Sequence, residues 1–430
     1  MQALLPGTAA ADPNVAVRQL TCAAAGACVG VASFDNKSDV ATGVIERLRD
    51  GRWRAMVAPV PRGTREPQKV TLTSVSCPTP ASCGVSGYLD TLSARRSELL
   101  TLRGGRWTAQ DAPVLPGTNA DSQTLSSISC PRPGRCVAVG RYQGAHDYFQ
   151  GLIEVQSGSR WRAVEAPLPR DAVRGHDPYG GVAWITCPAA GRCTSIGAYV
   201  DKKGHRELFA DVMVGRTWRS SRLPLPVGAA ANPIAYLDYV TCYSSARCLA
   251  VGNFDMSDGA QEGLFEREIS GTWHARPAPL PAGAPANPDA TINEASCPTI
   301  SFCAATGNYQ DNIGDSRGVL ETLSGGAWRA VTAPAPADDR TDRYMETVSC
   351  PIARWCVAGG STDYSGLLET YARGDWTVTV APLPARGGDA LFQSTSVSCR
   401  SARMCVAFGA FSKDHGSSSQ GQGLLETYRA

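Results

Sequence analysis

Sixteen cysteines are the residues of this sequence whose type and spacing point most directly to chemistry. All of them fall into pairs with the spacing C-x5-C. The pairs are Cys22–Cys28, Cys77–Cys83, Cys130–Cys136, Cys187–Cys193, Cys242–Cys248, Cys297–Cys303, Cys350–Cys356 and Cys399–Cys405. C-x5-C is not a usual zinc spacing, and the five histidines have no regular relation to the pairs. We therefore predict one disulfide per pair, which indicates an oxidising compartment and a secreted or periplasmic protein.

Aromatic residues close to carboxylates form a second recurrent pattern, downstream of the cysteine pairs. The candidate ligand-binding residues are Tyr88 with Asp90, Tyr142, Tyr199 with Asp201, Phe254 with Asp255, and Tyr309 with Asp311. An aromatic ring can stack on the apolar face of a sugar while a carboxylate accepts hydrogen bonds from the sugar hydroxyls. The aromatic residue also shares strand parity with the second cysteine, so the alternative is that it packs between neighbouring repeats and that the Asp is an ordinary turn residue.

Clustered acids in the same loops raise the question of a metal ion. Asp255 with Asp258 and Asp311 with Asp315 supply the oxygen ligands that Ca²⁺ prefers. Neither cluster matches a complete ligand pattern such as the EF-hand loop. We expect no cofactor, with Ca²⁺ at these four residues as the alternative to solvated loops.

Catalysis would require residues that break the repeat. The departures from it are Arg174–Asp177, Asp201–His205, Trp184, Trp355 and Asp338–Asp342. None of them contains a nucleophile with its base and orienting residue, or a metal triad. A further acid does repeat, at Glu46, Glu154, Glu266, Glu321, Glu369 and Glu426. Because it recurs, we expect it to have a structural partner, such as an Arg or a backbone amide of the neighbouring repeat.

These residues belong to eight copies of one unit, whose first cysteines stand at positions 22, 77, 130, 187, 242, 297, 350 and 399. In each copy Ser or Thr precedes the first cysteine, and in seven copies a Trp follows a glycine turn. Each copy has four runs of strand length separated by Gly, Pro and polar residues. The turn Asp50-Gly51 suits a tight hairpin that sets Leu48 opposite Trp53.

The repeat predicts the fold. A single sheet of four strands would leave its apolar faces in water, whereas eight such sheets can stack radially and bury them. We predict an all-β fold in which residues 1–430 form one domain, an eight-bladed β-propeller with four antiparallel strands and one hairpin disulfide in each blade. Leu4–Thr8 is similar to Val114–Thr118, so we expect circular closure, with the last blade completed by the N-terminal segment. We expect that residues upstream of Met1, including a signal peptide, were removed or belong to another segment.

Composition excludes two classes of protein. A net charge of +2 with 19% charged residues lacks the basic excess of a nucleic-acid binder. No apolar run approaches the roughly 18 residues that a membrane-spanning helix needs. We therefore expect neither nucleic acid nor a membrane span among the partners.

The repeated segments Ser-x-Ser-Cys-Pro, Cys-Val-Ala-Val-Gly, Leu-Leu-Glu-Thr, Gly-Gly-x-Trp and Ala-Pro-Leu-Pro resemble the repeats of secreted actinobacterial β-propeller proteins. The resemblance covers the whole chain and implies a fold rather than an activity, because propellers carry many functions. By analogy alone, lectins of the tachylectin type place a similar sugar site in every blade.

The function that these observations favour is a secreted, non-enzymatic binding module. We expect recognition of carbohydrate through the face that carries the long loops between strands two and three and between blades. The first alternative is a scaffold for an extracellular protein partner or assembly. The second is a lyase or hydrolase with its site on the propeller axis. The oligomeric state is left open.

Overall fold

The computed structural model describes residues 3–64, 69–92, 94–118, 122–144, 148–173, 180–336, 341–363, 365–382, 392–412 and 421–428. The secondary-structure elements named in these residues are all β-strands. The strands form antiparallel sheets, which we call blades. The described part of the chain contains no helix of sufficient length and apolarity to cross a membrane. The prediction of an all-β fold is thus confirmed.

The chain divides into two compact units. The first comprises Met1–Ala58, Ala260–Gly263 and Ala278–Ala430, and the second comprises Pro59–Gly259 and Leu264–Pro277. The strands of the first unit are β1 (Ala16–Ala24), β2 (Ala27–Asp35), β3 (Ala41–Arg49), β4 (Arg52–Val57), β21 (Thr291–Thr299), β22 (Phe302–Gln310), β23 (Ser316–Ser324), β24 (Ala327–Thr332), β25 (Arg343–Ile352), β26 (Trp355–Thr362), β27 (Gly366–Ala372), β28 (Asp375–Val380), β29 (Phe392–Ser401), β30 (Met404–Ser412) and β31 (Gly421–Tyr428).

The second unit contains four further blades, each with four strands. These strands are β5 (Lys69–Thr79), β6 (Ser82–Asp90), β7 (Arg95–Arg103), β8 (Arg106–Asp111), β9 (Thr124–Arg132), β10 (Arg135–Gln143), β11 (Phe149–Ser157), β12 (Arg160–Glu165), β13 (Gly181–Ala189), β14 (Arg192–Val200), β15 (Arg206–Val214), β16 (Thr217–Arg222), β17 (Ala235–Ser244), β18 (Arg247–Asp255), β19 (Gln261–Ile269) and β20 (Thr272–Pro277).

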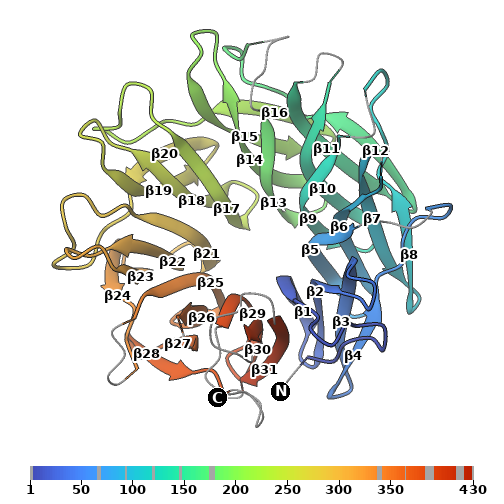
Figure 1. Ribbon diagram of the computed structural model, residues 1–430. Helices are drawn as coiled ribbons and strands as arrows, with labels where there is room; N and C mark the ends of the chain where they lie inside the picture. The colour runs from blue at the N-terminus through green and yellow to red at the C-terminus, as the bar shows by residue number, and fades with distance from the viewer. Residues whose placement is uncertain are drawn as a thin grey trace. The chain divides into compact units, whose positions relative to one another are not determined.

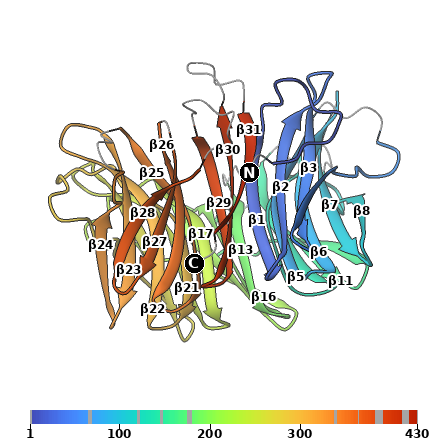
Figure 2. The same ribbon diagram turned by 90° about the horizontal axis from the view of Figure 1, so that it is seen from below.

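Register within a blade follows the predicted turns. Asp50 and Gly51 adopt φ angles of 52° and 75°, the left-handed conformations that a tight hairpin requires. The turn sets Leu48 opposite Trp53, as predicted, and both side chains are buried. In Figure 2 the strands β1, β2 and β3 of this blade stand side by side.

All eight predicted disulfides are present. Each bond joins the first two strands of its blade across their hairpin, and Cys22 lies directly opposite Cys28 in the register. The Cα atoms of each pair lie 4.0 to 4.2 Å apart. The whole chain leaves no free cysteine.

Within each unit, successive blades pack through their first strands. In the second unit β5 contacts β9, β9 contacts β13, and β13 contacts β17 (Figure 1). In the first unit β21 contacts β25, β25 contacts β29, and β29 contacts β1. Sheets stacked in this way have the arrangement of propeller blades, so each unit has a propeller-like fold.

The Ser before the first cysteine links one blade to the next in five copies of the repeat. The amide of Cys130 donates to Ser76 Oγ at 2.9 Å, and the amide of Cys187 donates to Ser129 Oγ at 3.0 Å. The amide of Cys22 donates in the same way to Ser398 Oγ at 3.0 Å, which places the N-terminal blade directly after the C-terminal one in the first unit. The repeated hydroxyl is therefore a contact between blades.

The segment before β1 also contacts the last blade. The amide of Ala3 donates to the carbonyl of Gly423 in β31 at 2.7 Å. Ala58 makes the equivalent bond to Gly43 at 2.8 Å, and Ala381 makes it to Gly366 at 2.8 Å. Ala3 thus takes the position that follows the fourth strand in other blades, as the similarity of Leu4–Thr8 to the end of a repeat predicts.

Candidate functional site

Four of the five aromatic candidates are buried. Tyr142, Tyr199, Phe254 and Tyr309 are between 0% and 6% exposed. The three tyrosine hydroxyls also have partners inside the protein, which are Gln150 Oε1 at 2.7 Å for Tyr142, Asp171 Oδ1 at 2.9 Å for Tyr199 and Thr332 Oγ1 at 2.7 Å for Tyr309. In this structure their ring faces contact the protein interior, as the packing interpretation has it, and offer no surface to a sugar.

Tyr88 is the exception, because it stands five residues after its cysteine whereas the others stand six after theirs. Side chains alternate between the two faces of a strand, so Leu89 fills the buried position and Tyr88 lies on the opposite face of β6. The assumption that Tyr88 shares the parity of its cysteine is therefore wrong. The guanidinium of Arg95 lies 4.6 Å from the centre of the Tyr88 ring and forms two hydrogen bonds with Asp90, at 2.6 and 3.0 Å.

The other candidate carboxylates are engaged in turns. Asp201 Oδ1 accepts hydrogen bonds from the amides of Lys203 and His205 at 2.8 and 2.9 Å. These bonds lower the pKa of Asp201 against the opposing effect of burial. Asp255 Oδ2 accepts a hydrogen bond from the amide of Ile234 at 3.0 Å. The Asp201 arrangement is local turn chemistry, whereas Asp255 connects the end of β18 to the segment that precedes β17.

In one of the two acidic clusters considered for Ca²⁺, the guanidinium of Arg317 lies between the two carboxylates, Asp311 and Asp315. Arg317 donates to Asp311 Oδ2 at 2.9 Å and to Asp315 Oδ2 at 2.8 Å, so its charge stands where a cation would be held. In the other cluster, Asp258 is exposed. A third group, Asp201 with His205 and Glu207, has ligand atoms within 4.8 Å of one another, but Glu207 is already bonded to Arg222 at 2.6 Å.

Two of the symmetry-breaking segments lie wholly or partly outside the described residues. Arg174–Asp177 is one, and in Asp338–Asp342 only Thr341 and Asp342 are described. Trp184 packs on Tyr239, with 4.7 Å between ring centres. Trp355 is half-buried against the core of the last two blades of the first unit. Both tryptophans thus pack against residues of the protein itself.

The recurrent acid of the third strand is buried. Glu46 and Glu266 are 1% and 0% exposed, and their carboxyl oxygens have no hydrogen-bond partner in the described structure. The expected partner in the neighbouring repeat is therefore absent at these two positions. Burial raises the pKa of Glu46 to about 8 and that of Glu266 to about 9, so both carboxyls are protonated near neutral pH. Asp211 takes the same register position in β15, and burial also raises its pKa.

The residues that do form an open site lie in a cavity of about 430 Å³ in the second unit, which we call the inner pocket. It is lined by Thr73, Tyr88, Arg95, Thr124, Leu125, Ser126, Gly140, Arg141, Gly180, Gly181, Val182, Ala183, Gly197, Ala198, Arg206, Tyr236 and Leu237. These residues come from all four blades of the unit, mostly from the first two strands near the ends where the long loops begin, while Arg95 and Arg206 begin the third strands β7 and β15. The pocket is thus on the predicted side of the blades.

The inner pocket exists because one blade carries small residues where its neighbours carry large ones. Gly181 pairs with Ala198 in the blade β13–β16. At the same register position the preceding blade has Arg141 and the following blade has Tyr236. A Cβ atom on Gly181 would lie 3.6 Å from the Cβ atom of Arg141, so the glycine lies at the foot of the arginine. The difference in side-chain size leaves a recess with a cation on one side and an aromatic ring on the other.

The inner pocket is positively charged. Among the described residues that line it, none is acidic and three are arginines. Each guanidinium lies over an aromatic ring: Arg95 over Tyr88, Arg141 over Phe149 at 4.5 Å, and Arg206 over Tyr236 at 4.4 Å. Asp90 neutralises Arg95, but Arg141 and Arg206 have no carboxylate partner among the described side chains. The Nε atom of Arg206 is buried without a hydrogen-bond partner.

Comparison with known proteins gives the fold and no more. No family model matches the chain, and no curated protein matches its sequence. Among solved structures, a prolyl endopeptidase matches with a TM-score of 0.50 at 9% identity, covering 94% of this chain and 55% of that one. A post-proline cleaving enzyme from Rickettsia typhi has a TM-score of 0.47 at 8% identity, with 90% and 57% covered. This chain therefore spans about half the length of these two proteins.

A further structural match is the fucose-recognising lectin of the fungus Aleuria aurantia, which has a six-bladed β-propeller fold. Its TM-score is 0.38 at 12% identity, and the match covers 88% of this chain and 99% of the lectin. At sequence identities this low, the activities of the matched proteins are not transferred to this chain. What this chain binds has to be argued from its own pocket.

Proposed function

We propose that this protein is a secreted, non-enzymatic binding module that recognises an acidic carbohydrate in the inner pocket. The observation that carries the proposal is the convergence of Arg141, Arg206 and Tyr236 on one recess whose described lining contains no acid. An uncompensated guanidinium binds a carboxylate through two parallel hydrogen bonds. The exposed Tyr236 and half-buried Tyr88 supply aromatic surface for the apolar face of a sugar ring.

The eight disulfides support export, because such bonds persist in oxidising compartments. The proposal extends to the architecture: the eight repeats form one closed eight-bladed propeller. Support comes from the hydroxyl-to-amide contact between successive blades, which also joins the last blade to the first. Because that contact is the same at each of these junctions, one repeat geometry suits a continuous series of blades.

The pocket residues also bear on the enzyme alternative. The described residues that line the inner pocket include no carboxylate, histidine or cysteine, so this lining lacks the acid and base pair of a glycosidase. The side chains that are present suit binding of an anion and stacking. We therefore propose recognition without turnover.

The proposal is tested by titration calorimetry with oligosaccharides that contain uronic acid and with their neutral counterparts. We expect the acidic set alone to bind, and Arg206→Ser to weaken binding at least tenfold. Arg219→Ser is the matched control, because Arg219 is exposed on β16 and does not line the inner pocket. Equal binding of neutral sugars, or full binding by the Arg206→Ser variant, would contradict the proposal. Chain cleavage during the titration would contradict its non-enzymatic part.

A further inference from the structure

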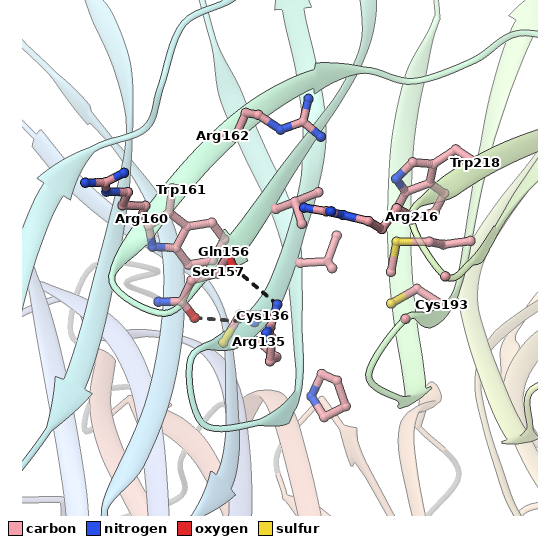
Figure 3. Close-up of a pocket in the computed structure, with 16 residues that line it drawn as sticks. Arg135, Cys136, Gln156, Ser157, Arg160, Trp161, Arg162, Cys193, Arg216 and Trp218 are labelled. Carbon is pink, nitrogen blue, oxygen red and sulfur yellow. Dashed lines mark hydrogen bonds between the residues drawn. The ribbon is translucent and has the colours of Figure 1, made fainter.

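A second cavity in the second unit lies between the blades β9–β12 and β13–β16, and we call it the outer groove (Figure 3). Its volume is about 470 Å³. Apolar side chains line it, namely Val137, Val155 and Met213, together with Cys136 and Cys193. Trp161 from β12 and Trp218 from β16 stand on its two sides in Figure 3. The groove therefore offers a long apolar surface between two indole rings.

Four arginines and no acid surround this apolar surface among the residues that the structure describes. They are Arg135, Arg160, Arg162 and Arg216. Arg135 donates a hydrogen bond to Ser157 Oγ at 3.2 Å, while the other three form no ion pair within the described part of the chain. In Figure 3 the side chain of Arg216 extends into the space between the two tryptophans. The Nε1 atom of Trp161 is also buried without a hydrogen-bond partner.

Comparison with an equivalent groove in the first unit shows which features of the outer groove recur in the repeats and which are its own. It lies between β24 and β28, has a volume of about 380 Å³, and has Trp328 and Trp376 at the corresponding places. In that hairpin Gly374 and Asp375 stand where the outer groove has Arg216 and Thr217. The paired tryptophans thus belong to the blade junction in general, whereas the excess of positive charge belongs to the outer groove.

We propose that the outer groove binds a segment of an anionic polysaccharide. Its sulfate or carboxylate groups pair with Arg160, Arg162 and Arg216, and the apolar face of a sugar ring stacks on Trp218. Arg160 and Arg162 are two residues apart on β12, so their Cα atoms are about 7 Å apart and can engage successive charged groups. Nucleic acid is a weaker fit, because a chain with a net charge of +2 lacks the broad basic face that such binding uses.

The outer groove is separate from the inner pocket. It contains Pro131 and Arg135, at the hairpin end of β9 and β10, whereas the inner pocket contains Thr124 and Arg141, at their other end. A substitution in one cavity therefore leaves the other intact. The inference stands whether or not the inner pocket binds a sugar.

The test measures heparin binding by calorimetry in a protein that already carries Arg206→Ser, which removes the inner pocket from the measurement. We expect the added triple change Arg160→Ser, Arg162→Ser and Arg216→Ser to weaken binding at least tenfold and to flatten its dependence on salt. Arg329→Ser is the matched control in the equivalent groove and should leave binding unchanged. Circular dichroism of each variant verifies the fold, since all these arginines except Arg206 are exposed.

Three outcomes would overturn the inference. The first is heparin binding by the triple variant that equals binding by its parent. The second is an equal loss in the Arg329→Ser variant, which would mean that net charge alone is responsible. The third is equally tight, salt-dependent binding of polyglutamate or duplex DNA, which would assign the groove to a different class of partner. Trp218→Ala adds an independent readout, because loss of stacking should weaken heparin binding without changing the salt dependence.

Discussion

At the scale of single residues, an offset of one position separates a core side chain from a site side chain. Tyr88 and Leu89 are neighbours in β6, and they lie on opposite faces of the strand. Leu89 is fully buried, while Tyr88 is half-buried under the guanidinium of Arg95 and lines the inner pocket. The two residues therefore form a natural pair for separating stability from binding.

We expect Leu89→Ala to lower the free energy of unfolding by about 2–5 kcal/mol, because it removes a fully buried side chain. Tyr88→Ala should cost less stability, since its side chain is only half-buried, and should weaken binding of acidic oligosaccharides. Urea unfolding and calorimetry measure the two effects. If Tyr88→Ala destabilises the protein as much as Leu89→Ala and leaves binding unchanged, Tyr88 has a packing role after all.

The sequence located the side of the blades that carries the inner pocket but not its decisive residues. The recurrent aromatics drew attention because they repeat, and most of them repeat because each blade needs the same core. Arg206 and Tyr236 stand in different repeats, and neither has a counterpart in every copy. One signal was available, since Tyr236 stands at a register position where the preceding blades have Gly181 and Thr124. A large residue at a position of small ones marks a departure from the common core.

At the scale of strands, the buried acid in the third strand of the blade makes the stability of the blade depend on pH. Glu266 lies in the middle of β19 opposite Ala275, is fully buried and has a pKa of about 9. Below its ordinary pKa of 4.5 the carboxyl is protonated in both the folded and the unfolded chain. As the pH rises from 4.5 to about 9, the carboxyl of Glu266 ionises in the unfolded chain but stays protonated in the folded one. The free energy of unfolding therefore falls over this pH range, and the stability present at low pH is lost.

We expect Glu266→Gln to reduce this pH dependence. Between pH 5 and pH 8 the carboxyl should lower the free energy of unfolding by about 1.4 kcal/mol for each pH unit, and the amide does not titrate. The advantage of the variant over the parent protein should therefore grow as the pH rises, as measured by urea unfolding at several pH values. Asp375→Asn is the control, because Asp375 is exposed on β28. Parallel pH profiles for the parent and Glu266→Gln would show that Glu266 is ionised in the folded protein.

The strands and their disulfides were predictable because they depend on neighbours in the sequence. Cys130 and Cys136 join across a single hairpin, and Leu48 and Trp53 face each other across one turn. The contact between Ser129 and the amide of Cys187 was not predicted in this form, because its partners lie in different repeats. The partner expected for the recurrent acid is missing at Glu46 and Glu266 among the described residues for a related reason. A repeated position shows that a residue is needed but not what surrounds it.

At the scale of the whole molecule, the net charge conceals how the charges are distributed. A value of +2 excludes a protein that is basic throughout, yet the described residues that line the inner pocket and the outer groove include arginines and no acids. The repeat predicted the four-stranded blade and the place of the N-terminal segment beside β31, since both follow from matching one repeat to another. It could not predict these cavities, because each depends on the residues in which adjacent repeats differ.

The positions of the two cavities lead to a prediction for the intact protein. β9 has the inner pocket at Thr124 and the outer groove at Pro131, and its nine residues span about 26 Å. The two proposed sites lie at opposite ends of β9, so we expect a single protein to hold two polysaccharide chains at once. Heparin carries both carboxylate and sulfate groups and can occupy either site.

We expect long heparin chains mixed with the protein to scatter light most strongly at an intermediate ratio, and an excess of heparin to abolish the scattering, because each chain then binds separate protein molecules. Short heparin oligosaccharides should saturate both sites without scattering. Arg206→Ser alone, or the triple arginine variant of the outer groove alone, should still bind heparin at one site but lose the scattering. Equal scattering by either variant would show that the bridging does not depend on two sites within one molecule and would point instead to association between protein molecules.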